Sequence, residues 1–149
     1  WDSLPRIGST SALGDVPVLV QRNEWDAAHG GDPFAGYQDH DFDTGQDVRL
    51  LDGEHDVFGD GSVVCFPTPG HTAGHQSLRV RTADSEVVLT GDACYFRESL
   101  ETGRLPVFGH DPDAQRRSLD VLRSMESAGS RLCFGHDPDQ VPDDTPIVL

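Results

Sequence analysis

Three short apolar segments of this chain each run into a glycine that is followed by an imidazole or a carboxylate. The first block is TPGHTAGH at residues 68–75 and carries His71, the second is a Gly-Asp pair with Asp92, and the third is a Gly-His pair with His136. A turn at a strand end presents its side chain into an open cleft, and glycine lets the backbone approach whatever that side chain holds. We therefore expect a sheet whose strand ends bring these three side chains together.

The three side chains form a mixed nitrogen and oxygen ligand set. Such a set suits zinc or a similar divalent ion, so we predict that His71, Asp92 and His136 converge on a metal. Asp92 has two carboxylate oxygens and can bridge two cations, as two-metal hydrolytic sites require. Taken alone, His71 could be a turn residue that caps a loop, and Asp92 could be a turn former or a helix cap. The repetition of the pattern favours the metal site.

Two residues beside these blocks are candidates for further roles. His75 could in principle be a second ligand, but it lies in the sequence GHQS, which leads straight into the next predicted strand. We therefore expect its ring to turn inward behind the site. Tyr95 follows Asp92 closely, and a phenol near a metal pair can donate a hydrogen bond to a carbonyl oxygen or a leaving alkoxide. The alternative for Tyr95 is a half-buried aromatic that only packs.

The remaining imidazoles have no such context. His110 is expected in a loop near the cleft, and Asp137, a carboxylate next to the third block, is expected in a loop. The three imidazoles expected at the surface are His29, His40 and His55.

The charge balance restricts the partners that this chain can have. It has 26 acidic residues against 11 basic ones, all arginine, and a formal net charge of -15. A surface this acidic repels phosphate backbones and anionic membranes, which argues against nucleic-acid binding. No window approaches the roughly 18 apolar residues of a membrane span, and the first residues lack a secretory signal pattern. A small-molecule substrate is the expected partner.

The three cysteines, Cys65, Cys94 and Cys133, are odd in number, widely spaced and placed in or beside apolar runs. They are therefore predicted to be buried thiols of a protein in a reducing compartment, the cytoplasm. Cys94 is the only one that could ligate a metal, because it lies two residues beyond Asp92.

Hydrophobic patterning predicts a layered α/β or α+β domain. The first half should contain a strand at residues 16–21, a short helix capped by Asn23 and ending at Ala28, and a long loop at residues 29–46. Further strands are predicted from apolar runs that Asp and Gly turns separate. These strands lie at residues 48–51, 62–66, 77–81 and 86–90.

The second half is predicted to contain one long helix and one strand. Asp111-Pro112 supplies a helix start with proline just inside it, and Gly129 ends the helix. Leu119, Leu122 and Met125 line one face of that helix. A strand follows at residues 131–134, and residues 147–149 are a candidate last strand. No internal repeat or linker divides the chain, so a single domain over residues 1–149 is expected.

With these blocks in view, the chain resembles the metallo-β-lactamase superfamily and, within it, the N-acyl-homoserine lactone lactonases. The matching runs are TPGHTAGHQSL, VVLTGDACY and CFGHD, and the resemblance covers about residues 16–140. The first run is shared across hydrolases of the superfamily, including glyoxalase II-like thioesterases. The spacing from Asp92 to Tyr95 favours the lactonases.

This resemblance implies an αββα sandwich, in which a mixed sheet has flanking helices. It also implies that His71 binds the first of two zinc ions, Asp92 bridges both, and His136 binds the second. Tyr95 would contact the lactone carbonyl or ring oxygen. The implied reaction is ring opening by attack of a metal-bound hydroxide on the carbonyl, after which Asp92 helps to move a proton to the leaving alkoxide.

The HxHxDH metal motif of the family, expected before residue 16, is absent from this sequence. Asp2 corresponds to a remnant of that motif and is a further candidate ligand of the second metal. We therefore expect the C-terminal part of a longer enzyme or a degenerate relative, with one apolar sheet face left uncovered. A glyoxalase II-like thioesterase and a metal-free, non-catalytic relative are the alternatives.

Overall fold

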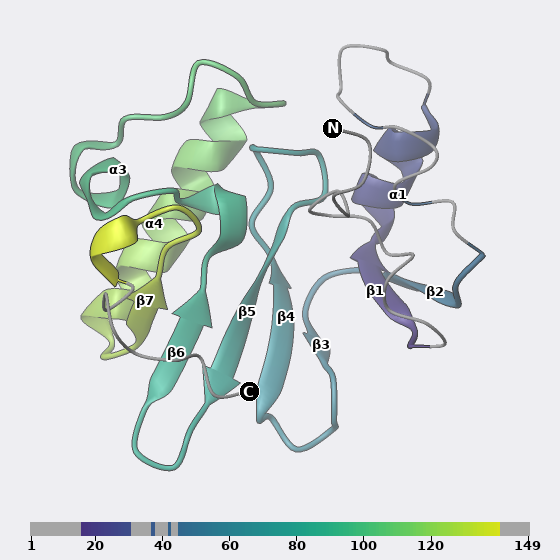
Figure 1. Ribbon diagram of the computed structural model, residues 1–149, viewed down its shortest axis with the longest axis horizontal. Helices are drawn as coiled ribbons and strands as arrows, with labels where there is room; N and C mark the ends of the chain where they lie inside the picture. The colour runs from purple at the N-terminus through teal and green to yellow at the C-terminus, as the bar shows by residue number, and fades with distance from the viewer. Residues whose placement is uncertain (1–15, 31–36, 38–41, 43–44, 141–149) are drawn as a thin grey trace, which may run out of the picture.

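The central element of the fold is a five-stranded sheet with the order β3-β4-β5-β6-β7 (Figure 1). The computed structural model describes residues 16–30, 37, 42 and 45–140. Strands β3 to β6 are antiparallel neighbours, whereas β7 pairs with β6 in parallel. The five strands are His55–Asp56, Val63–Pro67, Gln76–Arg81, Glu86–Leu89 and Arg131–Cys133.

A second, two-stranded sheet lies beside the β3 side of the large sheet (Figure 1). It consists of β1 (Val18–Gln21) and β2 (Val48–Leu51), which run parallel. Helix α1 (Arg22–His29) follows β1 without an intervening loop. This unit packs against the loop between β4 and β5, where Glu24 of α1 accepts the N–H of Gly74.

Two α-helices and a short 3-10 helix lie between β6 and β7, and a second short 3-10 helix follows β7. The crossover between these strands contains η2 (Gly91–Ala93), α3 (Arg97–Thr102) and α4 (Pro112–Ser127), and η3 (Pro138–Gln140) follows β7. Helix α4 places Leu119 and Leu122 against one face of the sheet, where both are fully buried in the main hydrophobic cluster. Within the described residues, no helix is long and apolar enough to cross a bilayer.

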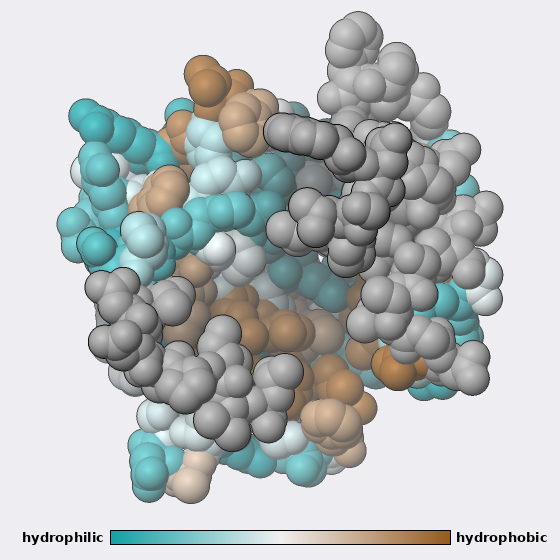
Figure 2. Space-filling model, in the orientation of Figure 1, coloured by the Kyte–Doolittle hydropathy of each residue, from teal (hydrophilic) through white to brown (hydrophobic). Residues whose placement is uncertain are grey.

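The opposite face of the sheet also carries apolar side chains. Cys65, Leu78, Leu89 and Cys133 lie side by side across β4 to β7 and alternate with the residues that face α4. Leu89 is 42% exposed, and Figure 2 shows apolar surface over this part of the sheet. Helix α4 thus covers one face of a sheet that is apolar on both.

Most elements predicted from sequence are confirmed to within about two residues. The strand at residues 48–51 has the predicted bounds, and α4 begins at Pro112 as expected. The Asp111 carboxylate accepts hydrogen bonds from the N–H groups of Asp113 and Ala114, which caps this helix. Cys65 and Cys94 are buried free thiols as predicted, while Cys133 is only partly buried.

Other predictions were wrong or incomplete. Asn23 does not cap α1, because the helix begins at Arg22 and Asn23 lies inside its first turn. The N-cap is Gln21, which pairs with Leu51 in the strand and makes no side-chain cap. His29, assigned to a loop, is the last residue of α1.

Strands and helices also occur where none was expected, at β3 and α3. His55, assigned to the surface, lies in β3, pairs with Cys65 of β4 and is partly buried. Most of the predicted loop at residues 29–46 and the candidate strand at residues 147–149 lie outside the described residues.

Replacing Asp111 with Ala should lower the melting temperature, because two N–H groups of the first turn of α4 lose their acceptor. Asp111→Asn keeps an acceptor oxygen and should melt close to the parent, since Asn and Asp cap helices about equally well. Thermal unfolding followed by circular dichroism measures both. Equal melting temperatures for all three proteins would contradict the role of the cap.

The same cap predicts a dependence on pH. Backbone hydrogen bonds, first that from Ala114, hold the pKa of Asp111 below its usual value. A lowered pKa in the folded state stabilises the protein above the ordinary aspartate range, and this contribution is lost as the pH falls through the lowered value. The difference in melting temperature between the parent and Asp111→Asn should therefore change only on the acid side.

Candidate functional site

The loop between β4 and β5 holds His71 against the start of α4. Gly70 has a φ of +133°, and a Cβ at this position would lie 2.2 Å from the backbone nitrogen of Gln115. The N–H of Asp111 donates to the carbonyl of Gly70 at 2.9 Å, and the N–H of His110 donates to the carbonyl of His71 at 3.0 Å. Only glycine permits this approach, so Gly70 fixes where His71 lies.

The glycines before Asp92 and His136, which are Gly91 and Gly135, lie next to each other. Strands β6 and β7 are parallel neighbours, so the turns that follow them lie at the same sheet edge. A Cβ on Gly135 would lie 2.7 Å from the carbonyl oxygen of Gly91 and 3.3 Å from Oδ1 of Asp92. The absence of a side chain at Gly135 therefore lets His136 approach Asp92.

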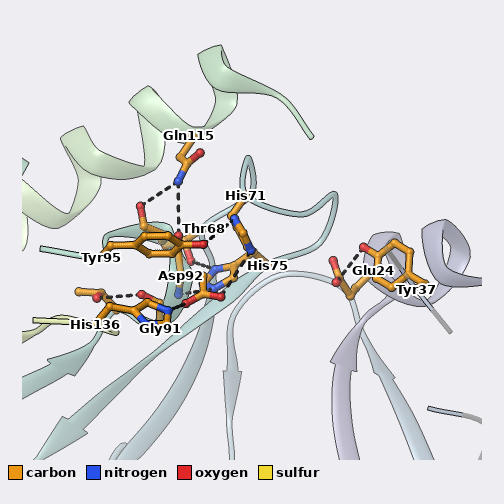
Figure 3. A network of polar contacts seen from close by, with 12 residues as sticks. Glu24, Tyr37, Thr68, His71, His75, Gly91, Asp92, Tyr95, Gln115 and His136 are labelled. Atoms are coloured by element: carbon orange, nitrogen blue, oxygen red, sulfur yellow. Dashed lines mark hydrogen bonds and ion pairs between the residues drawn. The ribbon is translucent and has the colours of Figure 1, made fainter. Parts of the chain in front are cut away.

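The carboxylate of Asp92 lies between two imidazoles (Figure 3). Its Oδ1 is 2.9 Å from Nε2 of His136, and its Oδ2 is 3.4 Å from Nε2 of His71. The side chains of Asp92 and His136 are 40% and 54% exposed, so a small molecule can reach them. The structure thus brings together the three residues that the sequence singled out, with one imidazole on each carboxylate oxygen.

Tyr95 lies over the two imidazoles. Its hydroxyl is 3.5 Å from Nδ1 of His71, and its ring centroid is 4.5 Å from that of His136. Burial, followed by the negative charge of Asp92, raises the pKa of Tyr95. The phenol therefore stays protonated at neutral pH and can act as a hydrogen-bond donor beside the carboxylate.

His75 contacts the site from behind. The N–H of Asp92 donates to Nε2 of His75 at 3.1 Å, and Nδ1 of His75 lies 2.9 Å from the hydroxyl of Thr68. Burial, followed by the charge of His71, lowers the pKa of His75, which favours the neutral ring. Both ring nitrogens are occupied, in agreement with the predicted inward orientation.

Sequence reasoning missed three residues that help to hold this arrangement in place, namely Glu24, Tyr37 and Gln115. Glu24 of α1 accepts the N–H of Gly74 at 2.7 Å and the hydroxyl of Tyr37 at 2.9 Å. Gln115 of α4 donates to the carbonyl of Asp92 at 3.3 Å. These contacts join residues 13 to 50 positions apart in sequence. No local pattern in one sequence could have indicated them.

The remaining candidates do not join the site. Asp137 accepts the N–H of Arg97 at 2.8 Å and so lies in a structural contact, as expected of a loop residue. The thiol of Cys94 donates to the carbonyl of Phe96, and burial raises its pKa to about 11, so it is a core thiol. Asp2 and His40 lie outside the described residues.

The donor types at this site suit a divalent metal, but their number is small. Within the described part of the chain, no group of three or more His, Cys, Asp or Glu side chains is arranged to hold one metal ion. The contacts instead run in pairs through Asp92, with one imidazole nitrogen at each oxygen. Zinc sites in proteins usually have four ligands. The three side chains fit one part of a metal centre, which further ligands would have to complete.

Comparison with known proteins places the site in context. The profile of the metallo-beta-lactamase superfamily matches residues 13–136. The chain is 39% identical over 142 residues to the N-acyl homoserine lactonase AttM of Rhizobium radiobacter, covering 87% of this chain and 54% of that protein. It is 32% identical over 135 residues to the N-acyl homoserine lactonase AiiA of Bacillus thuringiensis subsp. kurstaki, covering 89% and 52%.

Solved structures give the same picture. A crystal structure of a quorum-quenching N-acyl homoserine lactone lactonase superposes with a TM-score of 0.77 at 30% identity, covering 89% of this chain and 54% of that one. An N-acyl homoserine lactone hydrolase with the product N-hexanoyl-L-homoserine at its catalytic metal centre gives a TM-score of 0.74 at 32% identity, covering 85% and 49%. The chain spans about half the length of the curated relatives that it matches.

Proposed function

Because the chain belongs to the metallo-beta-lactamase superfamily, we propose that the protein opens the ring of N-acyl homoserine lactones by metal-dependent hydrolysis. The observation that supports this most is the carboxylate of Asp92, which meets His71 on one oxygen and His136 on the other. The lactonases to which the chain is similar support the choice of substrate.

Under this proposal, His71 and Asp92 would contribute to one divalent-ion site, and Asp92 and His136 would contribute to a second. Zinc is the preferred ion, because imidazole nitrogen and carboxylate oxygen both suit it. Bound divalent ions lower the pKa of water and polarise a carbonyl group. Asp2 is proposed as one of the additional ligands that so small a set requires.

The residues of this chain have distinct tasks in the reaction. Water adds to the lactone carbonyl carbon, the ring C–O bond breaks, and a proton reaches the departing alkoxide, which gives an N-acyl homoserine. The Asp92 side chain is 40% exposed, so its carboxylate can reach a bound substrate and transfer that proton. The Tyr95 hydroxyl donates to the carbonyl or ring oxygen as negative charge develops there.

A direct test uses the complete gene product that contains this chain, loaded with zinc. Incubation with N-acyl homoserine lactones of several acyl lengths should release acid, measured by titration at constant pH. Removal of metal with a chelator should abolish the release, and added zinc should restore it. The absence of turnover for every acyl length would overturn the proposal.

Replacing Tyr95 with Phe tests the proposed hydrogen bond to the substrate. In the complete protein, the variant should open lactones roughly 10- to 100-fold more slowly, the value of one hydrogen bond to a charged group. The ring contacts with both imidazoles should persist because only the hydroxyl is removed.

A thioester substrate serves as the comparison. If the parent hydrolysed thioesters faster than lactones and Tyr95→Phe left that rate unchanged, a glyoxalase II-like thioesterase would be the better assignment. A variant that opens lactones at the parental rate would remove Tyr95 from the reaction.

A further inference from the structure

A chain of hydrogen bonds runs from the site into the sheet and has fixed groups at both ends. At one end, the backbone N–H of Asp92 can only donate, and it points to Nε2 of His75 at 3.1 Å. At the other end, the carbonyl of Thr90 can only accept, and it receives the hydroxyl of Ser77 at 3.0 Å. Thr68 lies between, 2.9 Å from Nδ1 of His75 and 2.7 Å from Ser77 Oγ.

Because one end can only donate and the other can only accept, the donor of every hydrogen bond in this chain is determined. Because the Ser77 hydrogen goes to Thr90, Ser77 Oγ must accept from the hydroxyl of Thr68. Because the Thr68 hydrogen is then used, its oxygen must accept from Nδ1–H of His75. Nε2 is consequently the unprotonated nitrogen of a neutral ring and accepts the amide of Asp92.

The surroundings hold this chain in place. Thr68, Ser77 and Thr90 are at most 1% exposed, so an unpartnered hydroxyl there would be costly. Gly91 has a φ of +55°, and a Cβ on it would lie 3.0 Å from Nε2 of His75. Glycine at this position thus admits the imidazole to the backbone beside the carboxylate.

We propose that His75, held as the Nδ1–H tautomer by Thr68, is a positioning residue that orients Asp92 through its backbone amide. Gln115 donates to the carbonyl of Asp92 from the other side at 3.3 Å, so the backbone of this residue is held at both its N–H and its carbonyl. The side chain then meets His71 and His136 at its two oxygens. The consequence for lactone hydrolysis rests on the proposed function, whereas the tautomer does not.

The tautomer can be observed directly in the complete gene product that contains this chain. A long-range ¹H–¹⁵N correlation spectrum of the imidazoles at neutral pH should show a protonated Nδ1 and an unprotonated Nε2 for His75. In Thr68→Val, which keeps the shape but removes the hydroxyl acceptor, the Nδ1–H signal of His75 should shift and exchange faster with water. Thr82→Val removes an exposed hydroxyl in the turn after β5 and should leave the spectrum unchanged. A protonated Nε2 in the parent would overturn the proposal.

Amide exchange of Asp92 separates positioning from mere packing. In His75→Leu the Asp92 N–H should exchange roughly tenfold faster, since it loses one hydrogen bond. In His75→Gln the side-chain oxygen can replace Nε2, and most of the protection should return. Equal loss in both variants would reduce His75 to a packing residue, and no loss in either would remove the hydrogen bond.

These outcomes are independent of catalysis, because none of them requires lactone turnover. Should His75→Leu fail to fold, Thr68→Val and His75→Gln still decide the question. If the protein proves inactive toward lactones while the Nδ1–H tautomer is present, the proposed function fails and the positioning of Asp92 stands.

Discussion

In the complete gene product, Asp92→Asn should open N-acyl homoserine lactones about 10²- to 10⁴-fold more slowly, the usual contribution of a positioned proton-transfer group. An asparagine side chain has one acceptor oxygen and a donor NH₂, so it can accept only at one of the two positions that face His71 and His136. Metal content measured by elemental analysis should fall together with kcat/KM.

Asp84→Asn is the matched control. Asp84 lies exposed in the turn between β5 and β6, so this variant removes the same charge far from the site. It should keep the parental kcat/KM and metal content. An Asp92→Asn protein with full activity would show that the carboxylate, around which the whole site is arranged, takes no part in the reaction.

Gly70→Ala should be the most destabilising of the single changes considered. Its Cβ would lie 2.2 Å from the backbone of Gln115, and the φ of +133° is strained for any side chain. Strain of this kind costs about 1–3 kcal/mol, and overpacking a well-packed contact adds about 1–3 kcal/mol. Chemical denaturation followed by fluorescence would measure the loss in the free energy of unfolding.

Gly129→Ala separates the two causes. Gly129 has a φ of +109° after α4, but a Cβ there would meet nothing within 4 Å. This variant should therefore show only the strain, about 1–3 kcal/mol. If both variants lost the same amount, the close approach of the His71 loop to α4 would contribute nothing to stability.

Sequence patterns predicted those parts of the fold whose signals are local. The start of α4 was predicted because Pro112 follows Asp111 just inside the helix, and the structure shows that Asp111 caps it. Helix α3 was not, because no side chain next to it in sequence caps it. The first N–H of α3, that of Arg97, is accepted by Asp137, which lies 40 residues further along the chain. A cap supplied from that distance leaves no trace in the local pattern.

The wrong prediction that Asn23 caps α1 has a related cause. Asn is a favoured cap residue, and the local sequence indicated it. In the structure, the preceding residue is fixed by pairing between β1 and β2, and its side-chain amide donates to Gly53 at 2.9 Å and to Gln76 at 3.1 Å. This buried glutamine, Gln21, ends the strand and forces α1 to begin at the next residue. Tertiary contacts here override a local preference.

The candidate site shows the same division. The glycine patterns indicated His71, Asp92 and His136 because each follows a predicted strand end. The partners that hold these residues, Glu24 and Gln115, carry no such mark, since a glutamate or glutamine inside a helix is usually a solvated side chain.

The parallel pairing of β6 with β7 gives the carboxylate of Asp92 its second imidazole through a long connection, which has a consequence for folding. The antiparallel strands β4, β5 and β6 are joined in sequence, and their turns already bring His71 to Asp92. His136 is 44 residues from Asp92, and it arrives only after the segment containing α3 and α4 has closed into a crossover. Closing that longer segment costs chain entropy before any contact compensates for it. We therefore expect the His71 half of the site to form before the His136 half, which depends on the longest connection between paired strands of the five-stranded sheet.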